Sequence, residues 1–216
     1  MSSVDVVLPA LDEADAIPGV LASMPPGYRP IVVDNGSSDA TAMVAAELGA
    51  LVVREEARGF GAACYAGLVA AEAEVVCFMD ADGSFDSAQL HSVADPVLEG
   101  SCDLVLGARR AAPGSWPWHL RFANRVLALE LRRRTGLEPA TSGRCVRRGA
   151  RLCSHSAWWT AARAGPSRWC RSRAAGWRIG EVEVDYRPRI GSSKVTGTIG
   201  GMVRAVRDMG RHLSAH

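Results

Sequence analysis

The sequence predicts an α/β protein built on a mostly parallel sheet, with helices on both faces of that sheet. Three observations support this prediction. Apolar runs of strand length recur through the first half of the chain, segments with helical spacing separate them, and clusters of Asp, Gly and Ser follow the runs. Such alternation is typical of parallel sheets, whose polar strand ends gather along one edge, where open sheets bind ligands. A chain of 216 residues is long enough for one such domain with a sizeable core.

The predicted strands are residues 4–8, 31–33, 50–54, 75–79 and 103–106. Pro9 stops the first strand, and a helix is expected to open with Asp12, Glu13 and Asp15, because the helix dipole favours acidic side chains in its first turn. The inward stripe of this helix would comprise Leu11, Ile17, Val20 and Leu21.

The loops after the second and third strands carry the next signals. The second strand runs directly into Asp34 and a polar turn, which leads into a helix capped by Ser38 or Asp39. After the third strand, residues 59–63 open a helix whose small side chains allow close packing.

Two carboxylates follow the fourth strand, which is a fully apolar run. Asp80 and Asp82 lie two residues apart just past its end, so both can face the ligand crevice and together hold a hard divalent cation. Such a cation would in turn hold a diphosphate. A lone DxD is also an ordinary acidic turn, and only the other strand-end clusters, including Arg109 after the fifth strand, argue against that interpretation.

Charge is distributed unevenly along the chain. Residues 1–106 carry 3 basic and 17 acidic side chains, whereas residues 107–216 carry 22 basic and 6 acidic ones, giving about −14 and +16. A basic second half favours an anionic partner such as a phosphate or a lipid headgroup. No nucleic-acid-binding motif accompanies the arginines, so nucleic acid is not an expected partner.

The cysteines and the hydropathy pattern indicate the compartment. Six cysteines are scattered without the CxxC spacing of a zinc site, and nothing suggests a disulfide scaffold, so a reducing environment is expected. There is no signal-peptide pattern and no apolar run approaching the roughly 18 to 20 residues needed to span a bilayer. The expected location is cytoplasmic, or peripheral on the inner face of the membrane.

Two amphipathic helices are predicted in the second half. Residues 116–134 place leucines at helical spacing with arginines opposite, which fits packing on the domain better than a membrane contact. Residues 196–213 form a second, C-terminal amphipathic helix that is too short and too charged to span a membrane.

The motifs together resemble those of family 2 glycosyltransferases of the GT-A fold, and most closely the dolichyl-phosphate and polyprenyl-phosphate mannosyltransferases. The matching segments are PALDE at 9–13, VVDNGSSDAT at 32–41, GFGAACYAGL at 59–68, FMDADGSFD at 78–86, GAR at 107–109 and YRPRIGSSKVTGT at 186–198. Two positions depart mildly from the family pattern: Asp12 stands where Asn is usual, and Asn35 where a second Asp is common.

The resemblance implies a role for each matching position. Pro9 and Glu13 would line the ribose of the nucleotide, and Asp34 would hydrogen-bond its base. Asp80 and Asp82 would bind Mg²⁺ or Mn²⁺ on the donor diphosphate. The residues that would contact phosphates of the donor or of a lipid acceptor are Arg109, Arg187, Arg189, Ser193 and Lys194. The implied catalytic set is Asp82, Arg109 and Lys194. Without the acidic motifs, the C-terminal cations would be interpreted as a solvated basic strand end.

The resemblance divides the chain into a nucleotide-sugar-binding half at 1–110 and an acceptor half at 111–216. Within the second half, no acidic residue occurs between Glu138 and Glu181, and helix and strand periodicity both vanish. A GC-rich back-translation of residues 140–171, read one nucleotide earlier, permits Asp-x-Gly-Pro and Gly-Trp-Pro-x-Glu motifs that resemble those of this family. We hypothesise that residues 139–173 are translated out of frame and poorly ordered.

The expected function is inverting transfer of a sugar from a nucleoside-diphosphate sugar to a polyprenyl or dolichyl phosphate at a membrane surface, with Mg²⁺ or Mn²⁺ as cofactor. Two alternatives stay open: a catalytically impaired nucleotide-binding remnant, because the carboxylate expected near the acceptor is absent, and a sugar-1-phosphate nucleotidyltransferase. A Rossmann dehydrogenase is excluded, because no GxGxxG follows the first strand.

Overall fold

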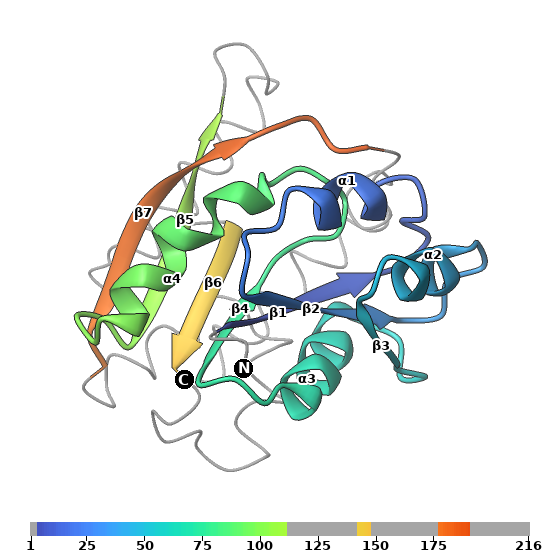
Figure 1. The fold of residues 1–216 in the computed structure, drawn as a ribbon, viewed down its shortest axis with the longest axis horizontal. Helices are drawn as coiled ribbons and strands as arrows, with labels where there is room; N and C mark the ends of the chain where they lie inside the picture. The colour runs from blue at the N-terminus through green and yellow to red at the C-terminus, as the bar shows by residue number, and fades with distance from the viewer. Residues whose placement is uncertain (1–3, 112–141, 148–176, 191–216) are drawn as a thin grey trace, which may run out of the picture.

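A seven-stranded sheet with helices on both faces forms the body of the protein (Figure 1). The computed structural model describes residues 4–111, 142–147 and 177–190. The strands are β1 (Val4–Ala10), β2 (Tyr28–Asp34), β3 (Leu51–Arg54), β4 (Val75–Phe78), β5 (Leu104–Ala111), β6 (Ser142–Arg147) and β7 (Ile179–Tyr186). The helices are α1 (Ile17–Ala22), α2 (Thr41–Glu47), α3 (Phe60–Ala70) and α4 (Leu90–Leu98), with a short 3-10 helix, η1 (Ser87–Gln89), before α4.

The strand order is β3-β2-β1-β4-β6-β5-β7, and the sheet is mostly parallel, as predicted. β1 pairs in parallel with β2 and β4, β2 with β3, and β5 with β7. Among the strands of the described ranges, only β6 is antiparallel to its neighbours, β4 and β5. The strands β1, β2, β3, β4, β5 and β7 therefore all end at the same edge of the sheet, and this edge carries the predicted polar clusters.

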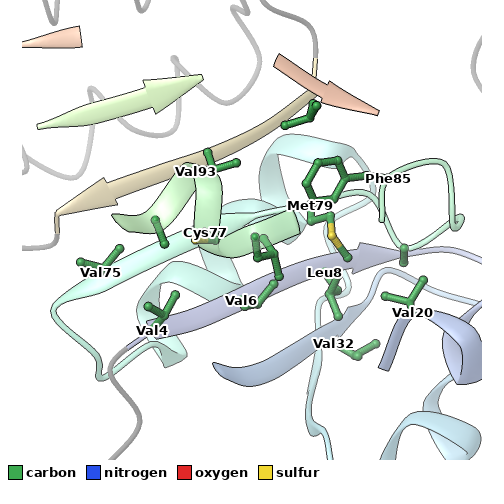
Figure 2. Packing of buried hydrophobic residues seen from close by; sticks show 14 of the residues in the cluster. Val4, Val6, Leu8, Val20, Val32, Val75, Cys77, Met79, Phe85 and Val93 are labelled. Carbon is green, nitrogen blue, oxygen red and sulfur yellow. The ribbon is translucent and has the colours of Figure 1, made fainter. Parts of the chain in front are cut away.

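Alternation along β1 divides the core between the two faces of the sheet. Val4, Val6 and Leu8 are buried in a cluster that includes residues of α1, α2 and α4, and Figure 2 shows this side of the sheet. Val7 points the other way and packs with α3, against residues such as Ala63. Because successive strand residues point to opposite faces, a continuous apolar run is the pattern that a doubly covered strand requires.

The structure corrects the predicted starts of two helices. α1 begins at Ile17, with no acidic residue in its first turn, so Asp12 and Glu13 lie in the preceding loop. Ala40, rather than Ser38 or Asp39, is the N-cap of α2. In both cases the polar side chains hydrogen-bond across to the neighbouring loop, as described below, and this tertiary bonding overrides the local capping preference.

Strand bounds differ by smaller amounts. β3 begins one residue after the predicted start, β4 ends before Met79, and β5 begins at Leu104 and continues to Ala111, so that Arg109 lies inside the strand rather than at its end. Strands β6 and β7 were not predicted. β6 lies within residues 139–173, and the out-of-frame hypothesis for that segment stays a prediction.

Of the cysteines in the described ranges, Cys64 and Cys102 form no disulfide, whereas Cys77 of β4 is disulfide-bonded. The expectation of reduced cysteines is therefore wrong at Cys77. The register of β4 and β6 places Cys145 opposite this residue, a proximity that sequence spacing does not reveal. None of the helices in the described ranges combines the length and hydropathy that crossing a bilayer requires. The predicted helices at 116–134 and 196–213 lie outside the described residues.

Candidate functional site

The loop after β4 presents its carboxylates at the carboxyl edge of the sheet. Met79 continues the strand direction, because its backbone N–H donates to the carbonyl of Val7 in β1 at 3.1 Å. Met79 and Ala81 are buried, whereas Asp80 between them is half-buried. Farther along, the buried Phe85 packs in the same core cluster as Met79, and both rest above β1 in Figure 2. These apolar anchors fix the loop and hence the position of its carboxylates.

Asp82 is buried, with 6% of its surface exposed, and its carboxylate has two partners. Oδ1 accepts a hydrogen bond from the backbone N–H of Ser84 at 2.9 Å, and Oδ2 lies 3.4 Å from Nη2 of Arg189. Gly83 between them has φ +72°, a left-handed conformation that suits glycine, so the chain turns tightly enough for the Ser84 contact.

Residues 187–190, which we call the β7 extension, run across this loop. The backbone N–H of Arg187 donates to the Ser84 carbonyl at 2.9 Å, and that of Ile190 donates to the Asp82 carbonyl at 2.9 Å. Figure 1 shows the chain continuing from β7 over the loop between β4 and α4. The extension thus brings Arg187 and Arg189 to the loop that carries the DxD sequence, although β6 and β5 separate β7 from β4 in the sheet.

Side chains reinforce this crossing. Nη2 of Arg187 lies 2.6 Å from Oδ2 of Asp86, whose Oδ1 also accepts from the Ala88 amide and caps η1. Gln89 and Asp185 exchange two hydrogen bonds: Nε2 donates to the Asp185 carboxylate at 2.8 Å, and Oε1 accepts from the Asp185 amide at 3.0 Å. The end of β7 and the β7 extension therefore contact both the DxD loop and η1 through hydrogen bonds and ion pairs.

The loops after β1 and β2 are joined by hydrogen bonds. The carboxylate of Asp12 accepts from the Ser38 amide at 2.6 Å, and the Glu13 amide donates to Oγ1 of Thr41 at 2.8 Å. Asp39 accepts from the Ala14 amide at 3.2 Å. Burial alone raises the pKa of Asp39, but hydrogen bonds from the hydroxyl and amide of Thr41 and from Ala14 outweigh it and hold that pKa below its usual value. These contacts place Glu13 beside the carboxyl ends of β1 and β2.

Asp34 is the last residue of β2 and is buried, with Oδ1 accepting from the Ser37 amide at 2.9 Å. The next residue, Asn35, organises the loop after β3. Its Nδ2 donates to the carbonyls of Glu55 and Ala57, both at 2.9 Å, and its Oδ1 accepts from the Gly59 amide at 2.7 Å. The amide in place of a carboxylate therefore has a structural reason, since a carboxylate could not donate to two carbonyls.

The structure brings together most of the predicted site residues. Asp34, Asp80, Asp82 and the β7 extension lie at or beyond carboxyl strand ends, and Pro9 lies one residue before the end of β1. The backbone of Arg109 pairs with Val184 of β7. Ser193 and Lys194 lie outside the described residues. The sequence did not indicate the Arg187–Asp86 and Gln89–Asp185 pairs, because nothing local to either partner specifies a contact so distant along the chain.

The carboxylates of Asp80 and Asp82 have the chemistry that a hard divalent cation prefers. Among the residues that the structure describes, no group of three or more His, Cys, Asp or Glu side chains is placed to hold a metal ion. Two carboxylates would leave the remaining ligands of such a cation to solvent and to phosphate oxygens, which is the usual situation of Mg²⁺.

The doubly covered, mostly parallel sheet with an acidic loop at its carboxyl edge defines the class as an α/β protein of GT-A type. Residues 5–148 match the family model for glycosyl transferase family 2, and the chain belongs to this family. The family predicted from the motifs is thereby confirmed.

Relatives and solved structures agree with this assignment. An uncharacterized glycosyltransferase of Mycobacterium tuberculosis is 41% identical over 98% of both chains. A dolichyl-phosphate hexose transferase of Haloferax volcanii is 29% identical, with 91% of this chain and 88% of that protein covered. A crystal structure of glucosyl-3-phosphoglycerate synthase from M. tuberculosis, in complex with Mn²⁺, UDP and glucosyl-3-phosphoglycerate, has a TM-score of 0.71 at 22% identity. It covers 99% of this chain and 79% of that one, and at this identity it shows the fold alone.

Proposed function

We propose that this protein is an inverting glycosyltransferase that moves a sugar from a nucleoside-diphosphate sugar to a lipid phosphate of the polyprenyl or dolichyl type. The observation that carries the proposal is the meeting of Asp82 with Arg189 at the carboxyl edge of the sheet. Acidic side chains that would bind a cation and arginines that would bind phosphates therefore lie together at this edge. The similarity to the dolichyl-phosphate hexose transferase of Haloferax volcanii supports a lipid-phosphate acceptor.

In the proposed reaction, an oxygen of the acceptor phosphate attacks the anomeric carbon of the sugar. The bond from that carbon to the donor's β-phosphate oxygen breaks, and the nucleoside diphosphate leaves from the opposite face. Mg²⁺ or Mn²⁺, held by Asp80 and Asp82, would supply positive charge against the leaving diphosphate. Arg187 and Arg189, on the β7 extension, would bind phosphate oxygens and stabilise the same developing charge.

The remaining residues would position the donor and acceptor. Asp34, fixed by the Ser37 amide, would hold the base, while Pro9 and Glu13 would line the ribose. Arg109, Ser193 and Lys194 would contact phosphates of the donor or of the acceptor. A phosphate acceptor is already anionic, so it needs little help from a general base, unlike a hydroxyl acceptor. This chemistry fits a chain without acidic residues between Glu138 and Glu181.

We propose that the enzyme works at the inner face of the membrane, where a lipid-linked phosphate is accessible from the cytoplasm. Arginine-rich segments in the second half of the chain would favour an anionic membrane surface. Sedimentation with vesicles that contain anionic lipid, compared with neutral vesicles, tests this location.

Calorimetric titration of UDP- and GDP-sugars, with and without Mn²⁺, tests the donor site. Asp80→Asn and Asp82→Asn should each remove the Mn²⁺ dependence of binding and slow donor turnover by about a hundredfold or more, because a charged ligand of the cation is lost. Asp15→Asn, in an exposed part of the loop before α1, is the matched control and should change neither. If both DxD variants bind and turn over donor like the parent protein, the assignment of the site is wrong.

The alternative, a remnant that binds nucleotide without transfer, is favoured by the missing carboxylate near the acceptor segment. Incubation with a radiolabelled sugar nucleotide and polyprenyl phosphate distinguishes the two. Metal-dependent binding without labelled glycolipid would support the remnant.

A further inference from the structure

Both carboxylate oxygens of Asp82 have a partner within the protein. Oδ1 receives the Ser84 amide, Oδ2 pairs with the Arg189 guanidinium, and only 6% of the residue is exposed. A cation that reached Asp82 by itself would therefore have to displace a guanidinium from a largely desolvated acid.

Arg189 can leave Asp82 without loss of the β7 extension. The extension is held by the backbone hydrogen bonds of Arg187 and Ile190, by the Arg187–Asp86 ion pair, and by the Gln89–Asp185 pair at the end of β7. None of these contacts uses the Arg189 side chain, which is 34% exposed to solvent. Its guanidinium can therefore move while the backbone on either side stays in place.

A guanidinium pairs with phosphate oxygens in the same charge-assisted geometry that it uses with a carboxylate. On the proposed function, the donor brings its diphosphate to the edge at which Arg189 stands. We infer that Arg189 is a positioning residue that occupies Asp82 in the free protein and transfers to the donor diphosphate, so that Asp82 becomes available to the cation only when the nucleotide binds.

This exchange makes the cation and the nucleotide bind as a coupled pair. Each ligand releases one partner of the same ion pair, so each must raise the affinity of the other by the same factor. The cation alone should bind weakly, because it competes with Arg189. The inference rests on the proposed donor site, and it adds that the cation binds tightly to this site only together with the nucleotide.

The test measures Mn²⁺ binding by electron paramagnetic resonance of the free ion, first without nucleotide and then with saturating UDP or GDP. Arg189→Gln removes the competing charge and keeps the backbone contacts, so Mn²⁺ affinity without nucleotide should rise by about tenfold. The factor by which nucleotide strengthens Mn²⁺ binding should shrink correspondingly. Arg178→Gln removes an equal charge from the residue that precedes β7, where it pairs with Asp103, and should change the nucleotide-free affinity by less than about twofold.

Arg189→Lys provides a second measurement if the glutamine variant does not fold. It keeps the charge but loses the planar fork, so its affinity for Mn²⁺ alone should exceed that of the parent protein, by less than the tenfold expected for the glutamine variant. Unchanged nucleotide-free affinity in both Arg189 variants, with normal nucleotide binding in the parent protein, overturns the inference and leaves the donor site intact. An equal rise in the Arg178 variant also overturns it, since the effect would then be general electrostatics. Absence of nucleotide binding in the parent protein, with or without Mn²⁺, overturns the donor site itself.

Discussion

Arg187, at the end of β7, donates to the carboxylate of Asp86 at a distance of 2.6 Å, and the same carboxylate caps η1 through the Ala88 amide. Asp86 thus joins two elements that are distant in sequence. The guanidinium is 62% exposed, whereas the carboxylate is 14% exposed. Because solvent screens the ion pair, the ion pair should contribute less to stability than the helix cap does.

Variants of Asp86 separate these two contributions. Asp86→Asn keeps a good capping side chain and removes the charge, so it should lower the free energy of unfolding by about 0.2 to 1 kcal/mol. Asp86→Ala also removes the cap and should lower it by about 1 kcal/mol more. Urea denaturation of both variants, and of each combined with Arg187→Gln, gives the coupling energy. A coupling well above 1 kcal/mol would contradict the screened pair.

Asn35→Asp should destabilise the loop at residues 55–59, although Asp is the more common residue at this position of the family 2 glycosyltransferase motif. A carboxylate cannot donate to the carbonyls of Glu55 and Ala57, so two hydrogen bonds become repulsive contacts in a largely buried position. The expected loss is about 2 to 4 kcal/mol at neutral pH. Differential scanning calorimetry measures it.

Asp15→Asn, the opposite change of charge at an exposed loop position, is the control and should stay within about 0.5 kcal/mol of the parent. A loss in Asn35→Asp no larger than in this control would mean that the amide contacts carry little energy. Because the proposed nucleotide site adjoins Asp34, weaker UDP or GDP binding should accompany the destabilised loop.

The strands whose carboxyl ends form this edge of the sheet could be predicted from the sequence, because each contains a contiguous run of mostly apolar residues. The run that forms β4 is apolar on both faces, as is the predicted core of β2 at residues 31–33, and β1 departs from this pattern over residues 4–8 only at Asp5. Such runs indicate doubly covered strands without knowledge of any partner. Asp80 and Asp82 follow from the same reasoning, since acids directly past a buried run must lie at a strand end. These two residues are the part of the candidate site that follows from the strand pattern, whereas the other predicted site residues, such as Arg187 and Arg189, follow from the family resemblance.

β7 was not predicted, although its sequence contains the pattern of a strand. In it Val182 and Val184 alternate with Glu183 and Asp185, and Val184 is buried while the two acids are exposed, the period-two signature of a strand. β6, with the sequence SGRCVR, carries no such signal, because its place depends on β4 and β5 on either side. The contact of Arg189 with Asp82 depends on that strand order, so local sequence could not indicate it.

Asp5 should be the residue on which stability depends most at acidic pH. It is fully buried in β1, and its carboxylate binds Arg29 at 2.7 and 2.8 Å and the amides of Glu72 and Ala73. Burial alone raises the pKa of Asp5, but the hydrogen bonds from Arg29 and from the two amides outweigh it and hold that pKa below 3.8. Asp5→Asn should lower the free energy of unfolding by about 3 to 5 kcal/mol, because it leaves a partly buried guanidinium with only the exposed Glu72 as an acidic partner.

The pH dependence follows from the lowered pKa. Below about pH 4 the unfolded chain takes up a proton at Asp5 while the folded protein does not, so stability falls as the pH drops through the folded-state pKa. Above about pH 4 the contribution is fully present. Urea midpoints between pH 7 and pH 3 should therefore decline less steeply in Asp5→Asn than in the parent. Glu72→Gln, on a side chain that is 80% exposed, should leave the slope nearly unchanged. A parallel decline in parent and Asp5→Asn would contradict the role of Asp5.

Two helical glycines should respond to alanine in opposite directions. A Cβ added at Gly67 of α3 would lie 2.3 Å from Cγ1 of Val7 in β1, whereas one added at Gly19 of α1 would meet nothing within 4 Å. Gly67→Ala should therefore push α3 away from the sheet and destabilise the protein by about 1 to 3 kcal/mol. Gly19→Ala should stabilise it by about 0.5 to 1 kcal/mol, since alanine is the better helix former and no contact opposes it. Thermal melting of the two variants gives both signs in one experiment, and stabilisation by Gly67→Ala would mean that α3 does not lie this close to β1.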